Sequence, residues 1–471
     1  MLLLITLGFA VGCRAADRPN ILFVLTEDQG AHLSCLGTPG LTTPHLDSLA
    51  REGVLFRRAF VTYPVCSPSK AALYTGLHAN TNGVRFNTVN YFKPASELTE
   101  QQLQNPKYRR MRIYDRYPTL IEKLRTAGYY TGVTYRLHVA PNHKFPFDQW
   151  IRRPSRASSL AFIRKARQQG KPWFLMYNMR HAHRPYRNSD TTAIGVDPAK
   201  VDPPDYLPDT AVVRKDWAEY LDNVQLADGL LGEALSALKE SGEEAKTLVI
   251  FTSDHGPAFH RAKKALYAAG LHVPLAIKGP GIREGLIRDE LVSQLDLMPT
   301  ILDMLGIKRP SIEHGISIRS LLQDPAGGKG HDYVVAFQHH HLWRSEEGMK
   351  EWTLYDGRYR LIYRENLNQV RELSDDLMLW KRWRNRSYGE TIAQHEKFPL
   401  QYKLLLQIDS ARIASKLPRF ELYDTTTDPA EIKNVAYDPP FADTVKRLRQ
   451  ALYDWAQRTK DPYISLEEER P

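Results

Sequence analysis

Four short strand-like runs, separated by long helical segments, limit the folds open to this chain. The runs occupy residues 20–26, 129–135, 173–179 and 247–252, and the first is continuously apolar, as expected of a strand buried on both faces of a parallel sheet. Apolar residues recur at helical spacing from 216 to 240, between the last two runs. Strands that alternate with long helices predict an α/β fold, a mostly parallel sheet with helices on both faces.

The residues that follow these strands can bind metals or exchange protons. They are, in chain order, Glu27 and Asp28, then Arg136 and His138, then HAHRPY at 181–186, and then SDHG at 253–256. Ligands of open α/β sheets bind outside the carboxyl ends of the strands. We therefore expect the four clusters to converge on one site, although each alone is typical of an ordinary strand-end turn.

The segment YPVCSPSKAALYTG at 63–76 places a cysteine near the start of a short helix. Ser67 followed by proline is a favoured helix start and Gly76 a favoured stop, so we expect a helix over 69–75. Cys66 would then lie just before the helix N-terminus, where unpaired N–H groups and the helix dipole favour an anion or a reactive group. The alternative interpretation is a buried thiol beside a capped helix.

Composition and charge narrow the class of partner. The chain has 471 residues, 42% of them hydrophobic and 25% charged, which is a globular composition with enough apolar residues for a large core. The formal net charge of +10 suits nucleic acid, a membrane surface or an anionic substrate. Because no nucleic-acid-binding motif accompanies the charge, we expect no nucleic-acid partner and favour a polyanionic sugar.

The first residues resemble an export signal. Residues 1–16 form an apolar run of signal-peptide length that ends in small residues, although the usual basic start is missing. We therefore expect a periplasmic or secreted protein. A lipoprotein anchor at Cys13 is a less favoured alternative, because Ala10 poorly matches the branched residue usual at that position. No later stretch is long and apolar enough for a transmembrane segment.

The alternation of helices and strands weakens towards the carboxyl end. Residues 292–305 predict a helix broken near Pro299, and the turn-rich segment at 325–330 indicates a surface connection. We place an α/β domain at 17–344 and a smaller α+β subdomain at 345–471. Cys35 has no evident cysteine partner, so disulfides are not expected to hold this fold.

The cysteine segment and its surroundings resemble the type I sulfatases of the alkaline-phosphatase-like superfamily. In that family the Cys of a Cys-x-Pro-Ser-Arg pentapeptide is oxidised to formylglycine, the catalytic aldehyde, and here the pentapeptide ends in Lys70. The other similar segments are NILFVLTEDQG at 20–30, TPHLDSLAREGVLFRRAF at 43–60, TLVIFTSDHG at 247–256, QLDLMPTILDMLGI at 294–307 and ELYDTTTDPAEIKN at 421–434. Within the family, FPFD at 145–148 and HRPY at 183–186 look most like the branch of N-sulfoglucosamine sulfohydrolase.

The resemblance implies a calcium ion. Its ligands would be Glu27, Asp28 and Asp254, with His255 and the modified Cys66 completing the set. Carboxylate oxygens are the hard ligands that calcium prefers. The ion would lower the charge of the sulfate group and orient the nucleophile.

The resemblance also implies roles for the surrounding residues. Formylglycine made from Cys66 would attack sulfur, His138 would take the proton of this nucleophile, and His183 would protonate the leaving group. Lys263 and Arg136 would bind sulfate oxygens. The residues that compete for these roles are His181 and His143 for the acid–base steps and Lys264 for sulfate binding.

Two segments differ from the family pattern. Lys70 stands where the family has Arg, and Tyr135 with Arg136 stands where the family has Gly-Lys. The family's Arg is part of the sequence recognised by a sulfatase-maturing enzyme, an implied partner, and it helps to fix the modified residue. Lys keeps the charge but loses the planar fork of two parallel hydrogen bonds. Our hypothesis is a partly converted, slow enzyme in which Lys70→Arg raises both the aldehyde fraction and the rate.

The sequence thus predicts a sulfatase that hydrolyses sulfate esters or sulfamates on a sulfated carbohydrate. One alternative is a phosphodiester or phosphonate hydrolase of the same superfamily, because phosphate and sulfate are similar in shape. The other is a catalytically silent protein that binds sulfated glycans. The sequence carries no signal for the oligomeric state or for the identity of the sugar.

Overall fold

The computed structural model of the chain describes residues 18–186, 195–340, 348–365, 367, 381, 385–408 and 417–464. The predicted export signal at 1–16 lies outside these residues. Within the described part of the chain, no helix combines the length and the apolar character that crossing a membrane requires.

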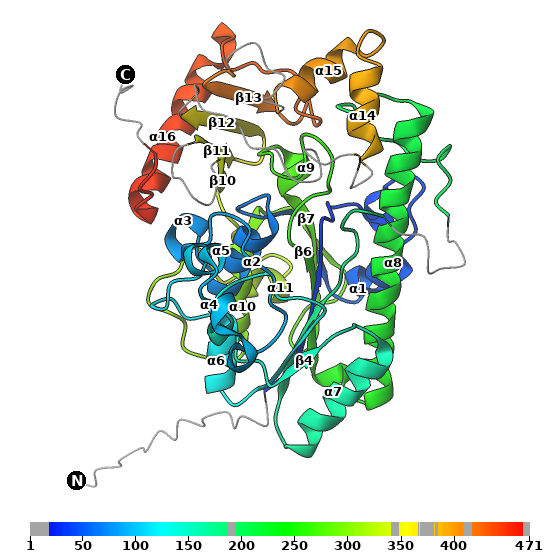
Figure 1. Ribbon diagram of the computed structural model, residues 1–471, viewed down its shortest axis with the longest axis vertical. Coiled ribbons are helices and arrows are strands. Elements are labelled where there is room, and N and C mark those ends of the chain that lie inside the picture. The colour runs from blue at the N-terminus through cyan, green and yellow to red at the C-terminus, as the bar shows by residue number, and fades with distance from the viewer. Residues whose placement is uncertain are drawn as a thin grey trace, which may run out of the picture.

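A nine-stranded sheet forms the centre of the described structure (Figure 1). Its strands are β1 (Asn20–Thr26), β2 (Val54–Phe60), β3 (Tyr130–Thr134), β4 (Gln149–Ile151), β5 (Trp173–Asn178), β6 (Thr247–Ser253), β7 (His272–Lys278), β8 (Leu286–Arg288) and β9 (Val292–Ser293). The order is β4-β3-β5-β1-β6-β7-β2-β8, and β9 pairs with β2. The first five strands in this order run parallel, whereas β7 is antiparallel to both of its neighbours.

The four strands predicted from the sequence are β1, β3, β5 and β6, and they are consecutive neighbours in the sheet. In β1 every residue is buried, and Phe23 lies opposite Met176 on one side and Ile250 on the other. Because the four strands are parallel, their carboxyl ends lie along one edge. The mostly parallel α/β sheet is confirmed, and the polar clusters leave it on the same side.

Helices cover both faces of this sheet (Figure 1). On one face are α2 (Cys66–Thr75), α6 (Leu120–Thr126), α10 (Leu297–Met304) and α11 (Arg319–Gln323), which pack against Ile21, Phe23 and Leu25. On the other face are α1 (Pro44–Arg51), α7 (Arg156–Gln168) and α8 (Ala211–Ser241), which pack against Leu22 and Val24. Successive residues of β1 therefore supply two hydrophobic cores, as the alternation of side chains along a strand requires.

A second, smaller sheet is antiparallel and lies towards the carboxyl end of the chain. Its strands are β10 (Val334–His340), β11 (Met349–Tyr355), β12 (Tyr359–Glu365) and β13 (Phe420–Asp424). Helix α16 (Ala442–Thr459) packs on one face, and α14 (Arg386–Ala393) and α15 (Pro399–Leu406) pack on the other. The expected α+β subdomain is confirmed. Its first strand begins at Val334, and the domain boundary at 345 stays a prediction.

Short helices fill the connections between the larger elements. They are α3 (Ala79–Asn82), α4 (Glu100–Leu103), α5 (Pro106–Arg110) and α9 (Ala268–Leu271).

Helix α2 begins earlier than its sequence predicts. The predicted cap at Ser67 is wrong, because α2 starts at Cys66 and the extended Val65 precedes it without a side-chain cap. The Ser67 N–H donates to Asn87 Oδ1 at 3.0 Å, and the Ser67 hydroxyl accepts from the Thr88 N–H at 3.2 Å. Contacts with a distant loop therefore satisfy the groups that a local cap would have satisfied.

The prediction of one helix over residues 292–305, broken near Pro299, is wrong. The segment begins as strand β9, and only Leu297–Met304 forms the helix α10. Pro299 lies in the first turn of α10, where a missing N–H costs no helical hydrogen bond.

Glu431 ties the loop after β6 to the second sheet. This residue is buried, and it receives the N–H of Ala268 at Oε2 over 2.7 Å. Its other carboxylate oxygen pairs with Arg360 of β12, and its backbone carbonyl accepts from Arg261. The loop between β6 and α9 is thus held in place from the carboxyl-terminal part of the chain.

Candidate active site

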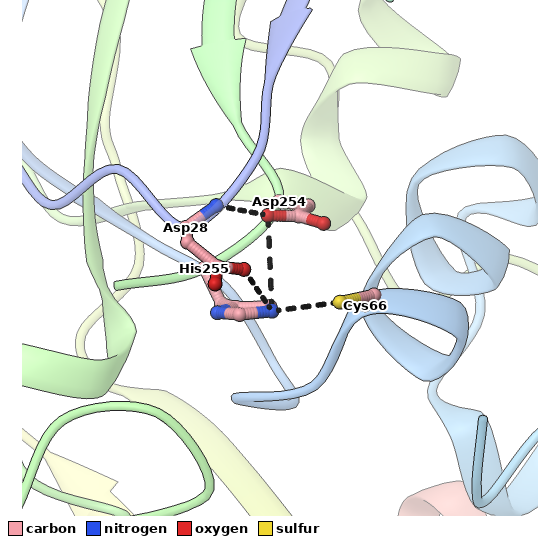
Figure 2. A group of neighbouring side chains, drawn as sticks. All are labelled: Asp28, Cys66, Asp254 and His255. Carbon is pink, nitrogen blue, oxygen red and sulfur yellow. Dashed lines mark hydrogen bonds and ion pairs between the residues drawn. The ribbon is translucent and has the colours of Figure 1, made fainter. Parts of the chain in front are cut away.

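Residues from two strand ends and from helix α2 meet at the carboxyl edge of the sheet (Figure 2). Asp28 follows β1, Asp254 and His255 follow β6, and Cys66 opens α2. One ligand atom from each of these four residues lies within 4.8 Å of the others. His255 Nε2 is 3.2 Å from Cys66 Sγ and 3.4 Å from Asp28 Oδ1. The structure thus brings together four of the five predicted metal-site residues.

Two carboxylate oxygens in this cluster suit a cation. Among the described residues, Asp28 Oδ1 and Asp254 Oδ2 are buried and accept no hydrogen bond, and their nearest cationic groups, on His255 and Lys70, lie 3.4 Å away. Leaving a buried polar atom without a partner costs about 1–3 kcal/mol, and more when the atom is charged. A cation between the two oxygens removes this cost, so the donor set of two carboxylates, one imidazole and residue 66 fits a divalent metal ion.

Glu27 lies outside this four-residue cluster. Arg136 Nε donates to Glu27 Oε1 at 2.7 Å, another nitrogen of the same guanidinium binds Oε2, and the Lys70 ammonium binds Oε1. Burial raises the pKa of Glu27, but the charges of Arg136 and Lys70 outweigh it and hold the pKa well below its usual value. Glu27 therefore neutralises two cations, and its role as a metal ligand stays a prediction.

Lys70 connects Glu27 to the metal cluster. Its side chain is completely buried, and its Nζ lies 3.4 Å from Asp254 Oδ2. The predicted position of Lys70 beside the nucleophile also follows from α2, because Cys66 and Lys70 are one helical turn apart.

The second carboxylate oxygen of Asp28, Oδ2, lies near two other predicted site residues. Lys263 Nζ donates to Asp28 Oδ2 at 2.8 Å, and His183 Nε2 lies 3.9 Å from the same oxygen. Burial raises the pKa of Asp28, but His183, Lys263 and His255 outweigh it and lower the pKa to about 2. Asp28 is therefore a carboxylate at any physiological pH.

The ring of His255 is oriented by the backbone. Its Nδ1 lies 2.9 Å from the Gly256 carbonyl oxygen, which leaves Nε2 turned to the cluster. Burial lowers the pKa of His255, but Asp254, the Cys66 thiol and Asp28 outweigh it and raise the pKa to about 10. A metal ion binds only the neutral imidazole, so metal binding at this site must release that proton.

His138 is neutral in this environment. Burial and the nearby charges of Arg136 and Lys70 hold its pKa well below the usual value. Its Nδ1 is buried and has no hydrogen-bond partner among the described residues. A neutral imidazole can accept a proton at the ring nitrogen that carries no hydrogen.

The two competing histidines take other positions. His143 is exposed and lies 2.8 Å from Asp115, so it does not belong to the cluster. His181 follows β5 and contributes its backbone, because its carbonyl accepts the N–H of Glu27 at 3.0 Å.

A buried ion pair that we did not predict fixes the segment after β5. Arg184 donates two parallel hydrogen bonds to Asp216, each of 2.8 Å, and both side chains are completely buried. The rings of Tyr186 and Phe259 flank the guanidinium at 4.3 and 4.6 Å. This bidentate pair anchors the residue next to His183 on helix α8. The sequence shows both charges, but no local pattern pairs residues 32 positions apart.

Several residues of the site adopt the left-handed backbone region. The φ angles are 56° at Asp28, 63° at Tyr135, 54° at His138 and 62° at Lys264. This region is unfavourable for residues other than glycine, and such strain concentrates at functional sites. The glycine that the family has in place of Tyr135 would adopt the same backbone without strain.

A cysteine at a helix start, a set of carboxylates that fits a cation and a rim of paired cations share one sheet edge. Together with the mixed, mostly parallel sheet, they match what we expect of a hydrolase of the alkaline-phosphatase-like class.

Comparison with known proteins narrows this class. Residues 19–307 match the model of the sulfatase family, and residues 256–378 match the model described as N-sulphoglucosamine sulphohydrolase, C-terminal. The chain belongs to the sulfatase family, and the protein is a sulfatase.

Individual relatives cover nearly the whole chain. Human N-sulphoglucosamine sulphohydrolase is 30% identical over 98% of this chain and 94% of its own length. An ulvan-active sulfatase of Formosa agariphila is 27% identical over 95% of this chain and 76% of its own length. The solved phosphonate monoester hydrolase from Silicibacter pomeroyi shares the fold, with a TM-score of 0.67 and 20% identity over 95% of this chain and 97% of that one.

Proposed function

We propose that this sulfatase uses formylglycine made from Cys66 and a bound calcium ion to release sulfate from a sulfated carbohydrate, as an ester or a sulfamate. The observation that carries the proposal is the buried cluster of Asp28, Cys66, Asp254 and His255 at the carboxyl edge of the sheet. The names of the relatives, which include N-sulphoglucosamine sulphohydrolase and ulvan-active sulfatase, support a sulfated sugar as substrate.

Asp28, Asp254, His255 and residue 66 would hold the ion. The buried oxygens without a donor on Asp28 and Asp254 favour a hard cation such as calcium. When bound, the ion lowers the negative charge of the sulfate group, and the formylglycine supplies an oxygen nucleophile.

The charges around the cluster suit an anionic substrate. The three buried carboxylates balance three cations, which are Glu27, Asp28 and Asp254 against Lys70, Arg136 and Lys263. A divalent ion added to this balanced set leaves excess positive charge. That excess attracts sulfate into a buried site, where the interaction is screened less than at the surface.

Two histidines would move the protons. The pKa of His138 is held well below its usual value, which favours the neutral ring, so this histidine would accept the proton of the nucleophile. His183 turns its Nε2 to the oxygen of Asp28 that also binds Lys263, and from this edge of the cluster it protonates the leaving atom. The ion pair between Arg184 and Asp216 keeps His183 at that edge.

We also propose the processing that this chemistry requires. Residues 1–16 would direct export to the periplasm or the outside of the cell, and a sulfatase-maturing enzyme would oxidise Cys66. The mature chain would consist of the α/β domain and the carboxyl-terminal α+β subdomain.

The test combines mass spectrometry with parallel assays. The exported protein, expressed with a maturing enzyme, is analysed for the aldehyde at residue 66 and for bound calcium, and Cys66→Ala serves as the matched control. We expect sulfate release from aryl sulfate and from N-sulfated or O-sulfated sugars by wild type only. Hydrolysis of an aryl phosphodiester alone overturns the proposal in favour of the phosphodiester or phosphonate alternative. Glycan binding without turnover by a protein whose Cys66 stays unmodified favours the binding-protein alternative.

A further inference from the structure

Cations gather around two aromatic rings beside the cysteine helix, and we name this group the aromatic rim. Its members are Arg85, Phe86, Lys107, Lys264, Lys350 and Tyr463. Lys107 Nζ and Lys264 Nζ lie 5.2 and 5.3 Å from the centre of the Phe86 ring. The Arg85 guanidinium carbon and Lys350 Nζ each lie 4.9 Å from the centre of the Tyr463 ring.

The loop that carries Phe86 is bonded to the first turn of α2. Its next residue, Asn87, accepts the Ser67 N–H at 3.0 Å, and the Thr88 N–H donates to the Ser67 hydroxyl at 3.2 Å. Ser67 follows Cys66 directly. Hydrogen bonds therefore hold the loop that carries the half-buried ring of Phe86 against the first turn of α2.

The Lys264 side of the aromatic rim is also bonded to the cysteine segment. The Lys264 N–H donates to the carbonyl of Pro64, two residues before Cys66, at 2.9 Å. Lys263 binds Asp28 in the metal cluster, whereas Lys264 lies over Phe86. Two successive lysines thus have different partners, and Lys264, the one at Phe86, has a left-handed backbone.

The two lysines at Phe86 suit an anion. Both ammonium groups lie within cation–π distance of one ring, so at most about 10.5 Å separates them. A sulfate or carboxylate group is attracted to both ammonium groups, and the ring offers an apolar surface to the carbon–hydrogen face of a sugar. A cationic and aromatic surface beside a buried reaction site therefore fits an anionic sugar chain.

We propose that the aromatic rim is a second anion subsite, which binds a sulfate or carboxylate group on the sugar next to the one that is hydrolysed. This inference rests on the proposed function and specifies its substrate as an oligosaccharide with at least two anionic groups. The preference for such chains comes from the aromatic rim, while the metal cluster and the histidines act on the reacting sulfate alone.

Three disaccharides with the same reactive sulfate test the inference. One carries a second sulfate on the neighbouring sugar, one a carboxylate there, and one no second charge, and aryl sulfate serves as the reference. We expect wild-type kcat/KM to be roughly tenfold higher for the doubly charged disaccharides, the gain of one charge-assisted contact. The ratio between the sulfate and carboxylate forms identifies the group that the subsite prefers.

Two variants test whether the aromatic rim causes the preference for doubly charged disaccharides. Lys107→Met keeps an unbranched side chain of similar length and removes its charge, and Phe86→Leu keeps an apolar side chain and removes the ring. Each should lower the preference for the doubly charged disaccharides about tenfold and lower its dependence on salt. Lys165→Met is the matched control, because Lys165 is exposed on α7, on the opposite face of the sheet.

Equal wild-type kcat/KM for all three disaccharides overturns the inference, and so does an unchanged preference in Lys107→Met. Failure of the proposed function is seen separately, as no turnover of aryl sulfate by a fully converted enzyme. In that event calorimetric binding of the disaccharides to Cys66→Ala, with and without Lys107→Met, decides on the subsite by itself. Equal affinity for the three sugars then refutes it.

Discussion

Replacing Lys70 by Met should damage both stability and activity. The Lys70 ammonium is completely buried, binds Glu27 and lies 3.4 Å from Asp254 Oδ2. Met keeps the length of the side chain but leaves these carboxylates without that charge. Removing one partner of a buried ion pair costs about 3–5 kcal/mol.

The cost should fall at the lower end of that range, about 3 kcal/mol, because Glu27 keeps its bidentate contact with Arg136. Asp254 keeps only the more distant His255, whose Nε2 lies 3.8 Å from Asp254 Oδ1, so most of the loss arises at the metal cluster. A calcium ion bound between Asp28 and Asp254 would compensate part of it. The destabilisation should therefore be larger in metal-free protein than in calcium-loaded protein.

The assay is urea unfolding of wild type, Lys70→Met and Lys70→Arg, each with calcium and with a chelator. Lys70→Arg retains the charge, so we expect it to lose less stability than Lys70→Met, although the larger guanidinium must fit a closed site. Aldehyde content at Cys66 and turnover per converted molecule are measured on the same samples. They test the hypothesis that Arg raises both quantities.

A Lys70→Met protein that unfolds at the wild-type urea concentration without metal would refute the reasoning, because the ammonium would then not be balancing the carboxylates. A wild type that is already fully converted, together with a Lys70→Arg variant that is no faster, would show that Lys70 is adapted to this site.

Three further predictions concern the metal, the substrate charge and pH. Asp254→Ala should abolish both calcium binding and turnover, measured by elemental analysis and sulfate release, and retention of both would contradict the ligand assignment. Affinity for sulfated oligosaccharides should fall as salt rises, and equal binding of desulfated chains would remove the basis for a cationic site. Burial lowers the pKa of His331, but Asp296, 2.9 Å away, outweighs it and raises the pKa. A raised folded-state pKa stabilises the protein below the unfolded value of about 6.5, and the effect is lost as pH rises through the folded value. His331→Asn should therefore lower the unfolding temperature more at pH 5.5 than at pH 9, and an equal loss at both would exclude a charged pair.

The positions of the main site residues could be predicted because they follow parallel strands. A polar pair after β1 and another after β6 must emerge at the same edge once the two strands are neighbours, and Asp28 and Asp254 do so. This prediction depends only on the strands and does not depend on the residues between the two strands. Cys66 joined the same site through the helix signal that follows it.

The partners of these residues could not be predicted, because tertiary contacts select them. Glu27 looks like the first of two metal ligands in the sequence, yet Lys70 and Arg136 bind its oxygens. The start of α2 was misplaced for the same reason, since Asn87 satisfies the Ser67 N–H from outside the helix. Helix propensity is a property of the local segment. It does not include hydrogen-bond donors or acceptors that another part of the chain supplies.

The contacts between Glu431 and the loop after β6 affect when the site can close during synthesis of the chain. The Cys66 thiol is 1% exposed in the finished fold, so an enzyme that modifies it must act before the fold closes. The loop that completes the site is held by a residue near the carboxyl end, which leaves the ribosome long after Cys66. At about 5–20 residues per second, roughly 20 to 70 s separate the two events. For an enzyme that modifies Cys66, the length of the chain after this residue would therefore act as a delay, and the speed of translation would set how long the thiol can be reached.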